Sequence, residues 1–128
     1  MLFLLGKDGI EIFLNKNMNL GKKSENLVCR FLKTKNFKII SQNWWLKRFG
    51  EIDIIALKDN CYYFIEVKSL TANEIFDPSV NYNLEKKKKF HRLINYYVNK
   101  NKIENFVACL ITVRKTNKNF IIKVFENV

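Results

Sequence analysis

The apolar positions of this chain change several times between a helical and a strand spacing. From Leu20 to Lys35 they recur three, four and seven positions apart, as on one face of a helix. The same spacing returns from Leu84 to about Lys100, behind a polar and basic face. We therefore expect two amphipathic helices, the first of which ends at Asn36.

Short runs rich in Ile, Val, Tyr and Phe predict the strands. The clearest two runs flank Asp59-Asn60, residue types that tolerate the left-handed backbone of a tight turn, so these runs should form a β-hairpin. The segment from Leu70 to Asn83 contains the only Pro and is expected to be a loop. The predicted strands cover residues 37–45, 50–57, 61–68, 106–113 and 120–125.

The order of these elements predicts the fold class. A helix, three strands, a second helix and two strands indicate an α/β fold with a mixed sheet covered by helices, because separate helical and all-β layers would leave such short elements unburied. The length of 128 residues suits one domain and leaves no room for a second.

Charge narrows the class of partner. The chain has 23 Lys and Arg against 12 Asp and Glu, a net charge of +11, which favours a polyanion such as nucleic acid. An anionic membrane surface is the competing explanation. The apolar start, Met1 to Leu14, is too short to span a bilayer. Three widely spaced cysteines and one histidine exclude ordinary zinc-finger spacing and favour reduced thiols in the cytoplasm.

The predicted hairpin brings charged residues together. A two-residue turn places Asp53 opposite Glu66 and Glu51 opposite Lys68, all on one face of the hairpin. Three carboxylates and one ammonium leave two negative charges, which one divalent cation such as Mg²⁺ would neutralise. A solvated face in which Lys68 pairs with Glu51 is the alternative. The other face, expected to be core, carries Ile52, Ile54, Ala56, Tyr63, Ile65 and Val67.

These residues also resemble a known family. Residues 50–56, GEIDIIA, and residues 64–68, FIEVK, are similar to the G-E-I-D-L-I-A and F-V-E-V-K core of the YraN-like family. That family consists of small bacterial proteins classed as predicted endonucleases of the restriction-endonuclease-like, PD-(D/E)XK superfamily. The resemblance implies an αβββαβ core with a mixed sheet flanked by helices and an extra C-terminal strand.

The resemblance further implies a Mg²⁺-dependent (or Mn²⁺-dependent) endonuclease-like protein that hydrolyses phosphodiester bonds in DNA, including branched or damaged DNA. Asp53 and Glu66, with the backbone carbonyl of Val67, would hold the metal. Lys68 would orient the attacking water or stabilise the transition state. A catalytically inactive nucleic-acid-binding module of the same fold is the alternative, and a protein-interaction domain with an acidic partner is a third.

Two further acids have alternative roles. Glu51 could serve a second metal or only pair with Lys68. Glu25 shares a helical stripe with Val28 and Leu32 and so leans towards the buried side. An acid in the first turn of a helix also simply complements the macrodipole, but the resemblance favours a catalytic role for Glu25.

Basic and aromatic residues suggest where nucleic acid would bind. Lys86, Lys87, Lys89 and Arg92 open the second helix, where backbone N–H groups already favour phosphate, although charge runs are usually solvated faces. Lys47 and Arg48 lie in an aromatic and basic segment with Trp44 and Trp45, which could stack a base or belong to the core. DNA is expected rather than RNA, and the protein could form a homodimer.

The start of the domain also follows from the resemblance. The family usually begins a few residues before the Gly and Glu of its first helix, which makes Met18 an alternative to Met1 as the functional start. Residues 1–17 are then an N-terminal extension that could be disordered, and residues 18–128 form a single nuclease-like domain.

Overall fold

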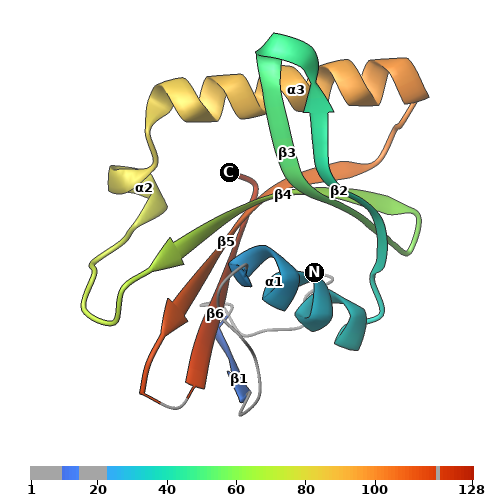
Figure 1. Cartoon of the computed structure of the whole chain (residues 1–128). Coiled ribbons are helices and arrows are strands. Elements are labelled where there is room, and N and C mark those ends of the chain that lie inside the picture. The colour runs from blue at the N-terminus through green and yellow to red at the C-terminus, as the bar shows by residue number, and fades with distance from the viewer. Residues whose placement is uncertain (1–9, 15–22, 118) are drawn as a thin grey trace.

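A six-stranded sheet organises the described part of the chain, with strand order β1-β6-β5-β4-β3-β2 (Figure 1). The computed structural model describes residues 10–14, 23–117 and 119–128. Only the β4 and β5 pair is parallel, and the other four pairs are antiparallel. The elements are β1 (Ile10–Leu14), α1 (Lys23–Thr34), β2 (Lys38–Leu46), a 3₁₀ turn (Lys47–Phe49), β3 (Gly50–Lys58), β4 (Cys61–Leu70), α2 (Pro78–Asn81), α3 (Leu84–Asn101), β5 (Phe106–Lys115) and β6 (Asn119–Glu126).

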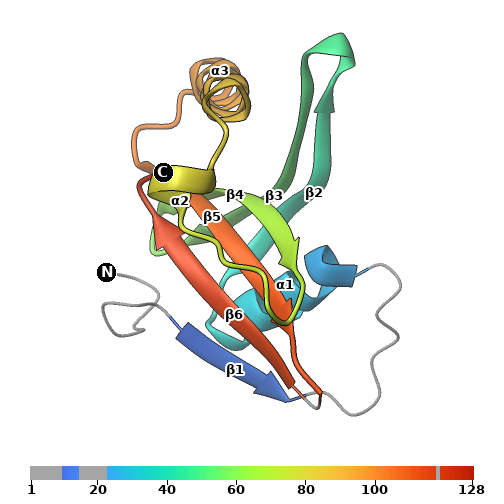
Figure 2. The ribbon, with the colours of Figure 1, turned by 90° about the vertical axis from the view of Figure 1, so that its left-hand side faces the viewer.

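Helices cover both faces of this sheet (Figure 2). The core on one face joins α1 to β3, β4, β5 and β6, and the core on the other face joins α3 to β3, β4 and β5. From α1 to β5 the long elements follow the order αβββαβ, and β6 adds the expected extra strand at the C-terminal end. The α/β fold with a mixed sheet and a restriction-endonuclease-like core is thus confirmed. None of the helices in the described residues combines the length and apolar character that crossing a membrane requires.

Helix α1 ends where the sequence predicts. Asn36 has a φ of 67°, and the Phe37 N–H donates to the Leu32 carbonyl across 3.0 Å. These features form a left-handed C-cap, for which Asn is a suitable residue type. The apolar stripe of the helix is fully buried and consists of Leu27, Val28, Phe31 and Leu32.

The β3–β4 hairpin forms in the predicted register. Asp59 and Asn60 have φ values of 49° and 61°, and the ladder runs from the Lys58–Cys61 pair to the Ile54–Ile65 pair. Beyond that pair, the β2–β3 ribbon rises away from the sheet beside α3 (Figure 1). The hairpin ladder therefore ends immediately before the acidic residues.

This divergence corrects two expectations from the sequence. The ladder does not pair Glu51 with Lys68: the Cα partner of Glu51 is Trp45 of β2. Ile52 does not share a core with Ile54 either, because it is buried with Ile55 in the core under α3. A strand that bends between positions 52 and 54 no longer alternates strictly between two faces, and the sequence pattern assumes such alternation.

One strand lies outside the predicted elements. β1, within the expected extension, pairs antiparallel with β6 and adds an edge to the sheet. The remainder of that extension, residues 1–9 and 15–17, and the alternative start at Met18 lie outside the described residues.

Replacement of Phe64 tests the core that joins the sheet to α3. The Phe64 ring is fully buried, with centroids 5.5 Å from the Tyr97 ring and 6.0 Å from the Phe106 ring. Phe64→Ala should lower the free energy of unfolding, measured by urea denaturation, by about 3 to 5 kcal/mol. Trp45→Ala, at a side chain with 66% exposure, is the control and should change it by less than about 0.5 kcal/mol. A loss below about 1 kcal/mol for Phe64→Ala would contradict this packing.

Candidate metal centre

Three carboxylates meet where β3 leaves β4. Glu25 from the first turn of α1 and Glu51 and Asp53 from β3 each bring one oxygen to within 4.8 Å of the other two. Glu51 is exposed, whereas Glu25 and Asp53 are half-buried. The helix contributes Glu25, a predicted catalytic acid. The strand contributes Glu51 and Asp53, two predicted metal ligands that lie 26 and 28 residues later in the sequence.

Asp53 is held inside this cluster by the neighbouring strand. Its Oδ2 accepts a hydrogen bond of 2.8 Å from the backbone N–H of Val67 on β4. Burial, together with the nearby carboxylates of Glu25, Glu66 and Glu51, raises the pKa of Asp53 to about 7, although the hydrogen bond from Val67 lowers it. Among the described residues, no positive charge offsets the burial of the Asp53 carboxylate.

The donor set fits a hard divalent cation. Carboxylate oxygens are the ligands that Mg²⁺ and Mn²⁺ prefer, and three of them converge here. Burial and the neighbouring carboxylates favour the protonated form of Asp53. A cation bound here would supply the positive charge in place of that proton. The Val67 carbonyl, a ligand that the family resemblance implies, belongs to the residue whose N–H already positions Asp53.

Glu66 lies on β4 with a different set of neighbours. Its Oε2 accepts a hydrogen bond of 2.6 Å from the hydroxyl of Tyr82, in the segment between α2 and α3. Burial and the nearby Glu66 carboxylate raise the pKa of Tyr82, so its phenol remains a proton donor. Glu66 also lines a cavity of about 130 Å³ with Lys68 and Lys86. Glu66 is thus not one of the three clustered carboxylates, but it lies near enough for its charge to raise the pKa of Asp53.

Lys68 points towards the loop that follows β4. Its Nζ lies 3.9 Å from Oε2 of Glu74 and 5.5 Å from the ring centroid of Phe76. Arg114 of β5 holds this loop, because its Nη1 donates to the carbonyl oxygens of Thr71, Ala72 and Glu74 at 2.8, 3.3 and 2.6 Å. The ionic partner of Lys68 is thus Glu74 and not Glu51, its partner in the alternative interpretation of the sequence.

Sequence reasoning assigned no role to three residues that position the charged groups. Tyr82 and Glu74 contact Glu66 and Lys68, and the Asn43 amide donates to Oε2 of Glu25 across 2.9 Å. Tyr82 and Glu74 lie in the predicted loop, where no periodic pattern indicates which side chains turn inward. For Asn43, the positive φ of 52° is a local feature that a strand pattern does not reveal.

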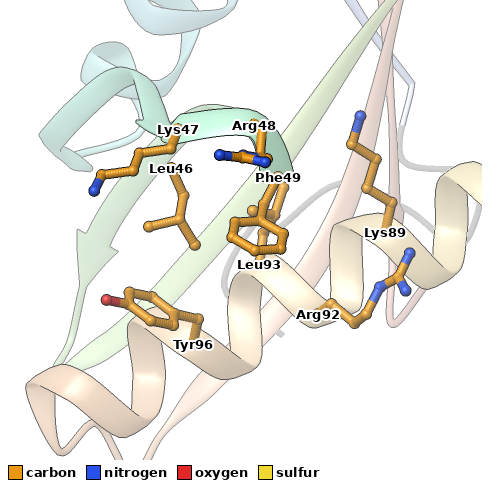
Figure 3. A pocket seen from close by; sticks show the side chains of 8 residues that line it. All are labelled: Leu46, Lys47, Arg48, Phe49, Lys89, Arg92, Leu93 and Tyr96. Carbon is orange, nitrogen blue, oxygen red and sulfur yellow. The ribbon is translucent and has the colours of Figure 1, made fainter.

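The predicted basic residues lie in three places: a groove, a cavity and the exposed surface of α3. Lys47 and Arg48 of the 3₁₀ turn and Lys89 and Arg92 of α3 line one groove (Figure 3). Lys86 lies in the cavity beside Glu66, and Lys87 is exposed on α3. The structure thus brings Lys47, Arg48, Lys89 and Arg92 together in the groove and leaves Lys86 and Lys87 outside it.

Two of the expected local roles change in the structure. At the start of α3, the backbone N–H groups of Glu85 and Lys86 already donate to Oδ1 of Asn83, so they are not free to receive phosphate. Trp44 is partly buried, packed against the core under α3, whereas Trp45 is 66% exposed. The core interpretation therefore holds for Trp44 and is wrong for Trp45.

The raised pKa of Asp53 predicts a pH-dependent stability. The folded-state pKa of about 7 exceeds the ordinary value of 3.8, so folding favours the protonated form of Asp53. The contribution of Asp53 to the free energy of unfolding is therefore highest below about pH 4 and is lost as the pH rises through 7. In metal-free protein, Asp53→Asn should therefore raise the free energy of unfolding at pH 8 by about 1 to 3 kcal/mol. Asn retains an oxygen for the Val67 N–H.

Urea denaturation at pH 4 and pH 8 in EDTA measures this effect. The stabilisation should shrink to about 0.5 kcal/mol or less at pH 4, where Asp53 is protonated in the folded state and roughly half protonated in the unfolded state. Asp59→Asn makes the same chemical change in the exposed turn of the hairpin and serves as the control. Equal effects of Asp53→Asn at both pH values would count against a desolvated, repelled carboxylate.

Comparison with known sequences places this chain among bacterial proteins. The sequence model described as "Uncharacterised protein family UPF0102" matches residues 24–120, a range that contains every predicted site residue. A UPF0102 protein of Campylobacter lari is 44% identical over 111 residues, which cover 84% of this chain and 91% of the relative. A UPF0102 protein of Helicobacter pylori strain HPAG1 is 40% identical over 114 residues, covering 89% and 94%.

Proposed function

This chain belongs to the uncharacterised protein family UPF0102, and from that premise and the acidic site we propose that it is a metal-dependent endonuclease acting on DNA. The family description names no activity, so the proposal rests on the site. The observation that carries it is the carboxylate of Asp53, held by a backbone N–H among further acids inside a protein of net charge +11. A local acidic site on a basic protein suits a cation that in turn binds phosphate.

The chain's own residues divide the work between binding and positioning. Asp53, Glu51 and Glu25 would hold Mg²⁺ or Mn²⁺, with Glu66 and the Val67 carbonyl as the ligands on β4. The cation would supply positive charge to the scissile phosphate and lower the pKa of water near it. Tyr82 orients Glu66, and Asn43 orients Glu25. Lys68 carries three N–H donors on a flexible stem and would orient the attacking water or stabilise the charge of the transition state.

A nucleic-acid-binding module without turnover is the second candidate. The observation that favours it is the position of Lys68, whose ammonium lies beside Glu74 and over the Phe76 ring. The nuclease requires the Lys68 ammonium to turn from Glu74 towards the acids, and the 43% exposure of its side chain leaves room for another rotamer. Activity would need that movement, whereas binding alone would not.

Cleavage assays on matched variants test the proposal. Asp53→Asn should lower Mg²⁺-dependent cleavage by at least about 100-fold, and Lys68→Ala by about 100-fold to 1,000-fold, because each removes charge complementary to the metal or to the transition state. Supercoiled plasmid, single strands and four-way junctions with Mg²⁺, Mn²⁺ or EDTA are the substrates and conditions. Asp59→Asn, in the exposed turn, should retain full activity.

The same assays decide between the two candidates. Metal-dependent cleavage that Asp53→Asn abolishes supports the nuclease. Oligonucleotide binding without cleavage of any of these substrates, unchanged in Asp53→Asn, would establish the binding module instead. Cleavage that persists in Asp53→Asn would contradict the assigned site.

The hydroxyl of Tyr82 provides a separate prediction for the nuclease. Tyr82→Phe removes the hydrogen bond to Glu66 and leaves the ring in place. Loss of a group that orients a ligand typically lowers metal affinity or activity about 10-fold to 100-fold. A Mg²⁺ titration of cleavage should therefore shift to higher concentration, with substrate KM nearly unchanged. A Mg²⁺ dependence identical to that of the wild type would exclude this positioning role.

A further inference from the structure

A groove of about 690 Å³ lies between the β2–β3 ribbon and α3, apart from the acidic cluster (Figure 3). Its ribbon side consists of residues 46–49, at the tip. Its helix side consists of four residues of α3, from Lys89 to Tyr96, that recur on one helical face. Two elements that are far apart in the sequence thus build the walls of one concave surface.

All of the charged side chains that line the groove are positive. Lys47 and Arg48 come from the ribbon, and Lys89 and Arg92 come from the helix, so both walls carry two cations. All four residues are exposed. Figure 3 shows the Lys89 and Arg92 side chains extending from the same stretch of α3. Such a surface has the charge complementary to a chain of phosphates.

Between these cations the groove is apolar and aromatic. Phe49 is 62% exposed and Tyr96 is 45% exposed, while Leu46 and Leu93 lie between the ribbon and the helix (Figure 3). The Tyr96 ring also neighbours the Trp44 ring, with a distance of 6.3 Å between the two centroids. Two exposed rings in a basic groove offer flat surfaces that would gain from covering by another flat apolar group.

Gly50 connects this groove to the acidic site. It has a φ of 120°, and a Cβ at this position would lie 2.5 Å from Cε of Lys89 and 3.4 Å from Cδ1 of Leu93. Glycine therefore allows the ribbon to leave its tip close to α3. Asp53 follows three residues later, which is about 10 Å along a strand. A ligand in the groove would thus extend within reach of the carboxylates.

We infer that this groove binds an unpaired stretch of nucleic acid, whose bases stack on Phe49 and Tyr96 while its phosphates contact the four cations. This inference rests on the proposed function and names the substrate class: DNA with a single-stranded segment. A duplex presents mainly sugar and phosphate to such a groove, because its base faces are stacked on one another. An unpaired strand presents phosphates and free base faces together, which match the cations and the rings.

Anisotropy measurements with fluorescein-labelled oligonucleotides in EDTA test the inference without turnover. The probes are a single strand of about 15 nucleotides and a blunt duplex of the same length. Phe49→Ala combined with Tyr96→Ala should weaken binding of the single strand by at least about 30-fold, because each lost ring removes the stacking of one base. Binding of the duplex should change by less than about threefold.

Three further variants locate the effect. Tyr96→Phe keeps the ring and should bind the single strand as the wild type does. Trp45→Ala removes an exposed aromatic residue of the same ribbon that does not line the groove, and it should also leave binding unchanged. Lys89→Gln combined with Arg92→Gln should weaken binding of both probes. For the single strand, it should also reduce the slope of log affinity against log salt by about 0.7 per lost phosphate contact.

The outcomes that would overturn the groove assignment differ from the outcome that would refute the nuclease. Equal losses for single strand and duplex in the Phe49 and Tyr96 variant, or an equal loss in Trp45→Ala, would overturn the groove assignment. If poly-glutamate displaced the labelled single strand at a lower concentration than the unlabelled single strand does, the groove would instead bind an acidic protein partner. Selective single-strand binding in a protein that cleaves nothing would leave the groove assignment intact and refute only the nuclease.

Discussion

The hydrogen bond from the Val67 backbone to Asp53 is the interaction on which the site depends. It joins β3 to β4 where the regular ladder between them has already ended at the Ile54–Ile65 pair. A carboxylate thus takes the place of a backbone acceptor at the fork between two strands. The same position partly shields Asp53 from water and places it near other acids, which is why the pKa of this carboxyl rises to about 7. Folding therefore creates a charge imbalance that a cation would relieve.

The fork also explains how so small a domain can carry two distinct surfaces. Because the β2–β3 ribbon leaves the sheet, its base contributes Asp53 and Glu51 to the acidic cluster, and its tip lies beside α3. The tip and α3 together form a basic and aromatic groove (Figure 3). A flat hairpin paired along its full length would keep the acids but would have no such groove. The bend of one ribbon thus relates a cation site to a surface for an extended polyanion.

Much of the fold follows from local patterns in the sequence. The two long helices, five of the strands and the register of the β3–β4 hairpin agree with periodicity and with the Asp59-Asn60 turn, because these features depend on neighbouring residues. Strand β1 did not follow from such a pattern. The wrong predictions concern residues whose side chains do not follow the strict alternation of a flat strand. Ile52 lies in the core under α3, and Trp45 is exposed to solvent. The partners of Glu66 and Lys68 come from a loop with no periodic pattern.

The sequence by itself determined the order of the elements, the turn of the hairpin, the positive charge of the chain and the identity of the acidic residues. Each of these properties depends on residue type and short-range spacing. Only the tertiary structure decided which acids converge, since Glu25 reaches Asp53 through the packing of α1 against the sheet. It likewise decided that Lys68 lies beside Glu74 and that residues 46–49 meet α3. Contacts between distant segments depend on how a strand bends and where a helix packs, and no local pattern encodes either.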